Sequence, residues 1–379
     1  MTKGPIGRNP EPAGSVMEGM KPISTIGWAV LASLAVATVG PGPAAAADTL
    51  REQSDLVLDP AGWKALEVEN ARGSIGVRSS ADGRVHLVAV KIVHGQTRRQ
   101  SAETARQIEV TTDKVEGRYL VSVHYPPRSD VRIGFWDLMS GVEFPRAQVR
   151  LEIEAPPGLT LRLRSSSGDL TSENRTGPQV LTARSGDITV RGARGPVEAT
   201  TSSGDLSATD IGAARLHASS GDISVHGARG PLAIQTASGD IQVKGAMDSL
   251  RLNASSGDIE VDAAPRGLAA GTVSGGIEAP AVAAWADLHS SSGDIGLGLQ
   301  APLKRAEVSS ASGAVRARIA AGVGCDLDAR TTSGTIDVGI PLTLSTVDRH
   351  AVTGRVAGGG ATVSLHTSSG DITVERGGR

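Results

Sequence analysis

The tetrapeptide Ser-Gly-Asp-Ile recurs at an almost constant spacing through the C-terminal half of this chain of 379 residues. It occurs in "SSGDISV" at 219–225, in "ASGDIQV" at 237–243 and in "SSGDIEV" at 255–261, so the central copies repeat every 18 residues. The glycines of the motif and of its degenerate copies are Gly168, Gly186, Gly204, Gly221, Gly239, Gly257, Gly275, Gly293, Gly313, Gly334, Gly354 and Gly370. A period this short predicts a solenoid, because each unit is too small to bury a core unless it stacks on its neighbours.

Each repeat contains two short segments in which apolar and polar residues alternate. Leu216 and Ala218 precede the glycine of one copy, and Ile223 and Val225 follow it. Alternation with a period of two predicts β-strands, and the Gly/Pro-rich "HGARGP" at 226–231 predicts a second corner. Aromatic residues make up only 2% of the chain, which favours a thin interior of small aliphatic side chains.

The predicted fold is therefore all-β, a single-stranded β-solenoid (β-helix) of about twelve coils of ~18 residues that occupies residues 155–379. Residues 48–154 alternate as strands without the full motif, and we expect them to form a strand-rich N-terminal cap. A cap is needed because an open solenoid end exposes unpaired strand edges and an apolar cross-section. Within this segment, 63–80 resembles a degenerate first coil in which Gly73 takes the place of the motif glycine.

An aromatic-rich stretch at 126–146 interrupts the alternation of the predicted cap. It contains Phe135, Trp136 and Met139, and Tyr119 and Tyr125 lie just before it. One interpretation is that these side chains form the core of the cap. The other is a protruding loop in which Phe135, Trp136 and Met139 contact a partner or a membrane surface.

The first 47 residues are typical of an export signal. An apolar run at 26–40, "IGWAVLASLAVATVG", is followed by the small residues Ala44 to Ala47. The run is shorter than the ~20 residues that a membrane span needs, so a cleaved signal peptide is expected rather than an anchor. The sequence then predicts an exported protein, periplasmic or at the cell surface, whose mature chain begins near Ala47 or Asp48 and has no transmembrane helix.

Charge and cysteine content restrict the possible partners. Lys and Arg number 38 against 40 Asp and Glu, so no basic excess indicates nucleic acid binding. The single cysteine, Cys325, cannot form an internal disulfide, and we interpret it as a small buried apolar residue.

The repeated Asp admits three interpretations. Gly supplies a positive φ at a sharp corner, and the adjacent Asp can accept a hydrogen bond from a backbone N–H two residues on, which forms an Asx-turn. A column of carboxylates could instead bind calcium, but Gly276, Ala314, Thr335 and Arg355 interrupt it. The turn residues so predicted are Gly168, Asp169, Gly186, Asp187, Gly204, Asp205, Gly221, Asp222, Gly239, Asp240, Gly257, Asp258, Gly293, Asp294, Gly370 and Asp371.

Catalysis is the third interpretation. Two carboxylates at a defined separation would be needed for glycoside hydrolysis, and an active site should break a repeat rather than follow it. The sequence contains no G-x-S-x-G, H-E-x-x-H or phosphate-loop motif. The turn interpretation is favoured, and no catalytic residue, metal or cofactor is predicted.

With its motif, its period and its apparent export signal, the chain resembles the bacterial putative-adhesin family of unknown function with Ser-Gly-Asp-Ile repeats in a β-solenoid. The resemblance extends over about residues 63–376 and is strongest at 165–297. It implies a protein of the cell envelope or an exported protein, and it brings no catalytic residues.

The predicted function is an exported, non-enzymatic, adhesin-like binding or scaffold protein of the bacterial cell envelope. Its partner would be an envelope protein or a polysaccharide. The alternative is a polysaccharide-active β-helix enzyme, which a pocket with two or three non-repeating carboxylates and an Arg or Lys would favour.

Overall fold

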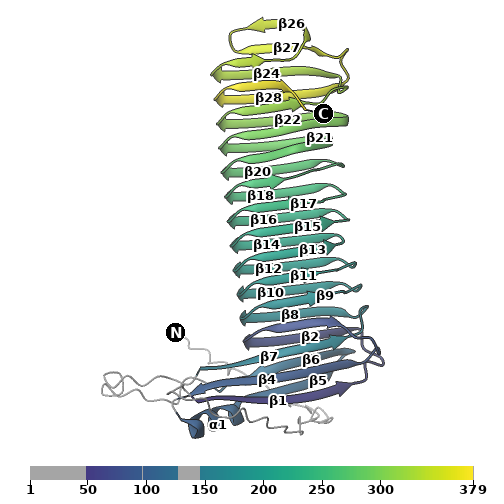
Figure 1. Cartoon of the computed structure of the whole chain (residues 1–379), viewed down its shortest axis with the longest axis vertical. Helices are drawn as coiled ribbons and strands as arrows, with labels where there is room; N and C mark the ends of the chain where they lie inside the picture. Colours follow the sequence, from purple (N-terminus) through teal and green to yellow (C-terminus); the bar gives the residue numbers. More distant parts are fainter. Residues whose placement is uncertain (1–47, 96, 127–145, 379) are drawn as a thin grey trace, which may run out of the picture.

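The computed structural model describes residues 48–95, 97–126 and 146–378, and in them the chain forms a long stack of β-coils (Figure 1). The prediction of an all-β solenoid is confirmed. The predicted signal peptide at 1–47 lies outside the described residues, as do Phe135, Trp136 and Met139.

Each coil contributes one strand to each of two parallel sheets. In a central coil, β14 (Ala214–Ser220) leads through the Gly221 corner into β15 (Ile223–Ala228). The next coil places β16 (Leu232–Ser238) beside β14 and β17 (Ile241–Lys244) beside β15, in parallel register. Strands one coil apart thus pair at the spacing of ~4.8 Å that is general for β-sheets.

The first sheet contains, in spatial order, β2 (Ala65–Arg72), β8 (Thr160–Ser167), β10 (Gln179–Ser185), β12 (Val197–Ser203), β14, β16, β18 (Leu250–Ser256), β20 (Leu268–Ser274), the second half of β21 (Ile277–Ser292), the second half of β22 (Ile295–Ser312), β28 (Ala361–Ser369) and β24 (Cys325–Ser333). The second sheet contains β3 (Ile75–Ser79), β9 (Leu170–Glu173), β11 (Ile188–Arg191), β13 (Leu206–Ile211), β15, β17, β19 (Ile259–Val261), the first halves of β21 and β22, β23 (Val315–Ile319), β29 (Ile372–Arg376) and β25 (Ile336–Val338).

The core is a narrow column between the two sheets. Leu216, Ile234 and Leu252 occupy equivalent positions in three successive coils, and all are buried. Full burial of one such side chain contributes about 1.5–3 kcal/mol. A single coil has only four or five of them, which is too few for a coil to be stable on its own. Cys325 belongs to this core with its side chain fully buried, as predicted, and burial raises the pKa of its thiol to about 11.

The motif glycines stack directly on one another at the Ser-Gly-Asp corner. Gly239 has a φ of +146°, and a Cβ atom placed on it would lie 2.2 Å from the carbonyl oxygen of Gly221 in the preceding coil. That separation is far below van der Waals contact. Glycine is therefore required at this corner for its backbone conformation and for the close approach of neighbouring coils.

The N-terminal segment extends both sheets below the array. The coil that contains Gly73 pairs with β8 and β9, so Gly73 lies under Gly168 although about 95 residues separate them in the sequence. On the first sheet, β6 (Arg118–His124) pairs with β2, and β5 (Glu109–Val115) pairs antiparallel with β6. On the second sheet, β7 (Arg146–Ala155) pairs with β3. Strand β4 (Val85–Gly95) pairs antiparallel with β7, and β1 (Asp48–Leu58) pairs antiparallel with β4.

Helix α1 (Arg98–Gln107) packs against β4 and β1 at the lower end of the rod (Figure 1). The side chain of Thr97 caps it by accepting a hydrogen bond from the N–H of Gln100, and Ser101 and Ala105 are buried. Across the described ranges, no helix is long and apolar enough to span a membrane.

Two of the aromatic residues near the aromatic-rich stretch are part of the cap. Tyr119 is buried and stacks on Trp63, with ring centroids 4.0 Å apart. The hydroxyl oxygen of Tyr125 lies within hydrogen-bond distance of Asn70 Oδ1 and of the carbonyl oxygen of Arg72, which share its one proton, and it accepts a hydrogen bond from the N–H of Val149. These two aromatics therefore join strands of the cap to one another.

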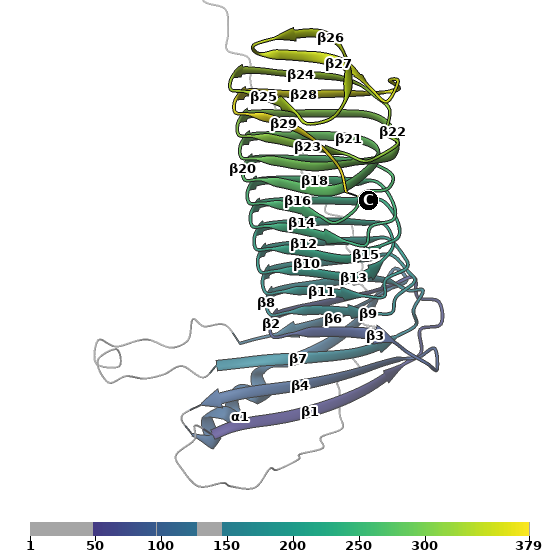
Figure 2. The ribbon, with the colours of Figure 1, turned by 45° about the horizontal axis from the view of Figure 1, so that its top comes forward.

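The C-terminal coils do not stack in sequence order, which corrects the regular series of glycine corners that the repeats suggested (Figure 2). The coil of Gly370 lies directly on that of Gly313, and the coil of Gly334 lies beyond it. Gly354 is not a corner at all. It lies in β27 (Ala351–Val356), which forms an antiparallel hairpin with β26 (Leu342–Asp348) and covers the free edge of β24. The last repeat retains the complete motif and can pair in parallel on both sides, whereas β27 is antiparallel to the array.

Candidate binding groove

The predicted turn residues stack along one corner of the rod. Each Asp carboxylate accepts a hydrogen bond from a backbone N–H one coil further on, as Asp222 does from Asp240 at 2.9 Å and Asp240 does from Asp258 at 2.8 Å. The same bond runs from Asp187 to Asp169, Asp205 to Asp187, Asp222 to Asp205, Gly276 to Asp258, Ala314 to Asp294 and Thr335 to Asp371. The column therefore joins successive coils.

This arrangement corrects the Asx-turn expected within each corner. The N–H of the Asp residue points toward the preceding coil, while the N–H groups of the adjacent Gly and Ile point toward the following one. Because no backbone carbonyl accepts that one N–H, the carboxylate below it does. Gly276, Ala314 and Thr335 donate this bond to the carboxylate of the coil below, but they carry no carboxylate themselves, so the column of Asp side chains lapses at these coils as the sequence suggested.

Along the described ranges, no group of three or more His, Cys, Asp or Glu residues is arranged to hold a metal ion. The Asp side chains of the column are exposed and point into solvent. At Asp371, hydrogen bonds from the backbone and hydroxyl of Thr335 hold the pKa of the carboxyl below its ordinary value.

Replacing Asp240 by Asn should hardly change the melting temperature, with or without a calcium chelator. The amide oxygen of Asn can still accept from the N–H of Asp258, and exposed substitutions usually change stability by about 0.5 kcal/mol or less. A calcium site would instead contribute about 2.7 kcal/mol at a hundredfold excess over Kd. Thermal unfolding followed by circular dichroism, with and without EDTA, measures this. A drop of several degrees on chelation of the unmodified protein would contradict the turn interpretation.

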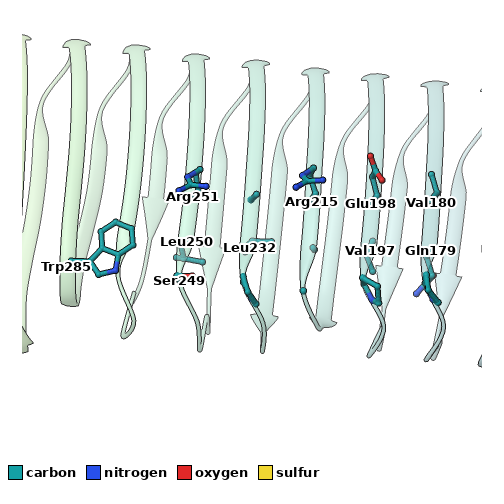
Figure 3. A pocket seen from close by; sticks show the side chains of 16 residues that line it. Gln179, Val180, Val197, Glu198, Arg215, Leu232, Ser249, Leu250, Arg251 and Trp285 are labelled. Atoms are coloured by element: carbon teal, nitrogen blue, oxygen red, sulfur yellow. The ribbon is translucent and has the colours of Figure 1, made fainter.

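A groove with a volume of about 480 Å³ runs along the rod at the opposite end of the first-sheet strands (Figure 3). Its lining residues come from the starts of successive strands and from the corner before each. They are Pro178, Gln179, Val180, Pro196, Val197, Glu198, Ala213, Ala214, Arg215, Pro231, Leu232, Ala233, Ser249, Leu250, Arg251 and Trp285. From Pro178 to Trp285 the groove crosses six inter-strand steps of ~4.8 Å, which gives a length of about 29 Å.

Trp285 closes one end of this groove (Figure 3). Ala286 pairs with Leu268 of the preceding coil, so Trp285 occupies the position that Gly267 has in that coil. A Cβ on Gly267 would lie 2.2 Å from the indole ring, so the ring rests directly on the glycine backbone. The half-buried indole therefore presents a fixed apolar surface to the groove.

The groove combines an apolar floor with few charges. Pro178, Pro196 and Pro231 supply rigid apolar surface, and the charged side chains that line it are Glu198, Arg215 and Arg251. A single carboxylate does not provide the pair of acidic groups that a glycosidase requires. Among its lining residues, the groove therefore lacks the carboxylate pair that the enzyme alternative requires.

A Ser-His-Asp row lies on the same sheet beyond Trp285. The Nε2 atom of His289 is 2.7 Å from a carboxylate oxygen of Asp287, and its Nδ1 atom is 2.6 Å from the hydroxyl oxygen of Ser309. The strands on either side pair continuously here, so their N–H groups serve the sheet and are not free to stabilise an oxyanion. We interpret the row as a side-chain contact within β21, between Asp287 and His289, and one between β21 and β22, from His289 to Ser309.

Sequence reasoning missed the groove, although a signal for it exists. Pro178, Pro196 and Pro231 occupy equivalent positions in their coils. Trp285 occupies the same position six coils after Pro178, and it is the one large aromatic residue in that column. Alignment of the coils by their first strands, rather than by their glycines, would have marked Trp285 as an exception.

A family model described as Toastrack DUF4097 matches residues 63–287 and 272–375. No curated protein matches the sequence. The chain is also similar to a solved structure of a putative adhesin from Bacteroides fragilis, at 14% identity and a TM-score of 0.36, over 70% of this chain and 96% of that one. A putative adhesin from Parabacteroides distasonis shows 12% identity and a TM-score of 0.32 over 70% and 96%. A putative lipid binding protein from the same species shows 12% identity and a TM-score of 0.30, over 85% of this chain and 96% of that one.

Proposed function

The chain belongs to the Toastrack DUF4097 family, and on this basis we propose that it is a non-enzymatic binding protein that holds an extended partner in its groove. The observation that carries the proposal is the continuity of the groove across the coils from Pro178 to Trp285. Ligand sites in proteins are typically concave and largely apolar with a few polar groups, and this groove meets that description. Its length suits a polymer better than a compact small molecule.

We further propose that the protein is exported and acts at the bacterial cell envelope. The support is the apolar run at 26–40 with the small residues that follow it. A rod of stacked coils presents this groove along its side over the coils from Pro178 to Trp285, which suits an adhesin-like or scaffold role at a surface.

Replacing Trp285 by Ala should reduce binding to a bacterial cell-envelope fraction at least tenfold. The substitution removes the apolar wall at the closed end of the groove, and aromatic residues that contact ligands commonly contribute 2 kcal/mol or more, roughly a thirtyfold change. Cosedimentation of the purified mature chain with the fraction measures the effect.

Leu344→Ala is the matched control, because Leu344 is an exposed large apolar residue on β26 at the far end of the rod. It should bind as the unmodified protein does. Equal binding by Trp285→Ala and the unmodified protein would show that the groove is not the binding site. Release of soluble sugar from the fraction on incubation would favour the enzyme alternative.

A further inference from the structure

Two arginines, Arg215 and Arg251, stand in one column on the same side of the groove (Figure 3). The strand register aligns Arg215 with Ala233 and Ala233 with Arg251, so the two guanidinium groups are separated by two coils. With ~4.8 Å between strands, their backbones lie about 10 Å apart. Ala233 leaves the space between them open.

Both guanidinium groups are available to a ligand. Arg215 and Arg251 are exposed, and neither forms an ion pair with any residue in the described parts of the chain. Glu198 is one coil from Arg215 and is the single acidic residue of the lining. Between Arg215 and Trp285 the lining therefore carries two positive charges and no negative one. Asp287 continues the column of Arg215 and Arg251 two coils further on, but it lies outside the lining and is paired with His289.

Neutral hydrogen-bonding side chains accompany the groove on the outer face of the same sheet. They lie two residues further along each strand than the column of Arg215 and Arg251, and so on the same face. The column consists of Thr182, Thr200, His217, Gln235 and Asn253. It offers one donor or acceptor group per coil beside widely spaced charges.

Resting on the proposed function of the groove, we infer that its ligand is an anionic polysaccharide with negative groups spaced about two coils apart. Carboxylates or sulfates on alternate sugars of an extended chain meet Arg215 and Arg251. The hydroxyls face the neutral column, and the apolar face of a sugar ring packs on Trp285. Single-stranded nucleic acid fits less well, because its charges are denser and it is usually held by several aromatic side chains.

The test measures the affinity of the mature chain for hyaluronan and chondroitin sulfate oligosaccharides, which carry a carboxylate on alternate sugars. Arg215→Gln and Arg251→Gln should each weaken binding about tenfold, since one charge-assisted hydrogen bond is lost. Arg184→Gln is the matched control with the same change in charge, because Arg184 is exposed on the same sheet outside the groove lining. Isothermal titration calorimetry measures the dissociation constants.

Chemical reduction of the carboxylates of the hyaluronan oligosaccharide leaves it uncharged and should abolish its binding to the unmodified protein. The proposal is overturned if reduced and native hyaluronan oligosaccharides bind equally, if Arg184→Gln weakens binding as much as the groove variants, or if oligo-dT binds more tightly. The envelope-fraction assay separates the two levels of inference. Binding that depends on Trp285 but not on Arg215 and Arg251 would refute the anionic ligand alone, and independence from all three would refute the groove itself.

Discussion

Gly239→Ala should destabilise the solenoid by about 2–6 kcal/mol, which is an unusually large effect for the addition of one methyl group. The backbone of Gly239 has a φ of +146°, and the added Cβ would meet the carbonyl oxygen of Gly221 at 2.2 Å. Strain from an unfavourable φ costs about 1–3 kcal/mol, and overpacking a close contact adds about 1–3 kcal/mol. Urea unfolding followed by circular dichroism should show a lower midpoint.

Two other glycines separate these causes. Gly83 has a φ of +74° with no atom within 4 Å of an added Cβ, so Gly83→Ala tests the backbone strain alone. Gly313 lies outside the positive-φ region, but an added Cβ would lie 2.1 Å from the carbonyl oxygen of Gly293, so Gly313→Ala tests the contact alone. Each should cost less than Gly239→Ala. A Gly239→Ala protein as stable as the unmodified one would mean that the coils are not packed as described.

Arg175→Ala should cost about 3–4 kcal/mol, because it combines a lost buried hydrogen-bond network with a cavity. The side chain of Arg175 is fully buried, and its guanidinium donates to the carbonyl oxygens of Ala155 at 2.7 Å and Leu159 at 3.1 Å. Burial lowers its pKa to about 10, so it remains charged at neutral pH. These bonds tie the first full repeat to the end of β7 and the turn after it.

The loss of stability in Arg175→Ala should be confined to the junction between the cap and the array. Hydrogen exchange should rise around Ala155 and Leu159 and stay unchanged in the central coils, since neighbouring units of a solenoid unfold in part independently. Arg194→Ala is the matched control, because Arg194 is an exposed arginine of the next coil and its loss should have little effect. Uniform destabilisation of the whole rod, or none, would contradict the role of Arg175 as the link.

Much of the fold follows from the sequence, because its determinants are local and repeated. The alternation around Leu216 and Ile223 defines strands of period two, and the recurring glycine defines the corner between them. Neither depends on knowing which coil lies next to which. The burial of Cys325 could likewise be predicted from its alternating neighbours.

The partners of these local units were decided by the tertiary structure. Which strand pairs with which depends on the edges that remain free after the whole chain has folded. For this reason Gly73 stacks under Gly168, Gly370 precedes Gly334 in space, and Gly354 lies in a hairpin. The same reason gives the motif Asp a hydrogen-bond donor in the following coil rather than in its own turn.

The groove was also decided by the tertiary structure. Arg215, Arg251 and Trp285 are far apart in the sequence, and each looks like an ordinary exposed residue in its own repeat. Only the parallel register of the first sheet sets them along one edge. The sequence by itself determined a stack of coils with a glycine corner, because those features arise from short-range backbone geometry. The order of the coils and the site along their side arose from long-range pairing, which no single repeat contains.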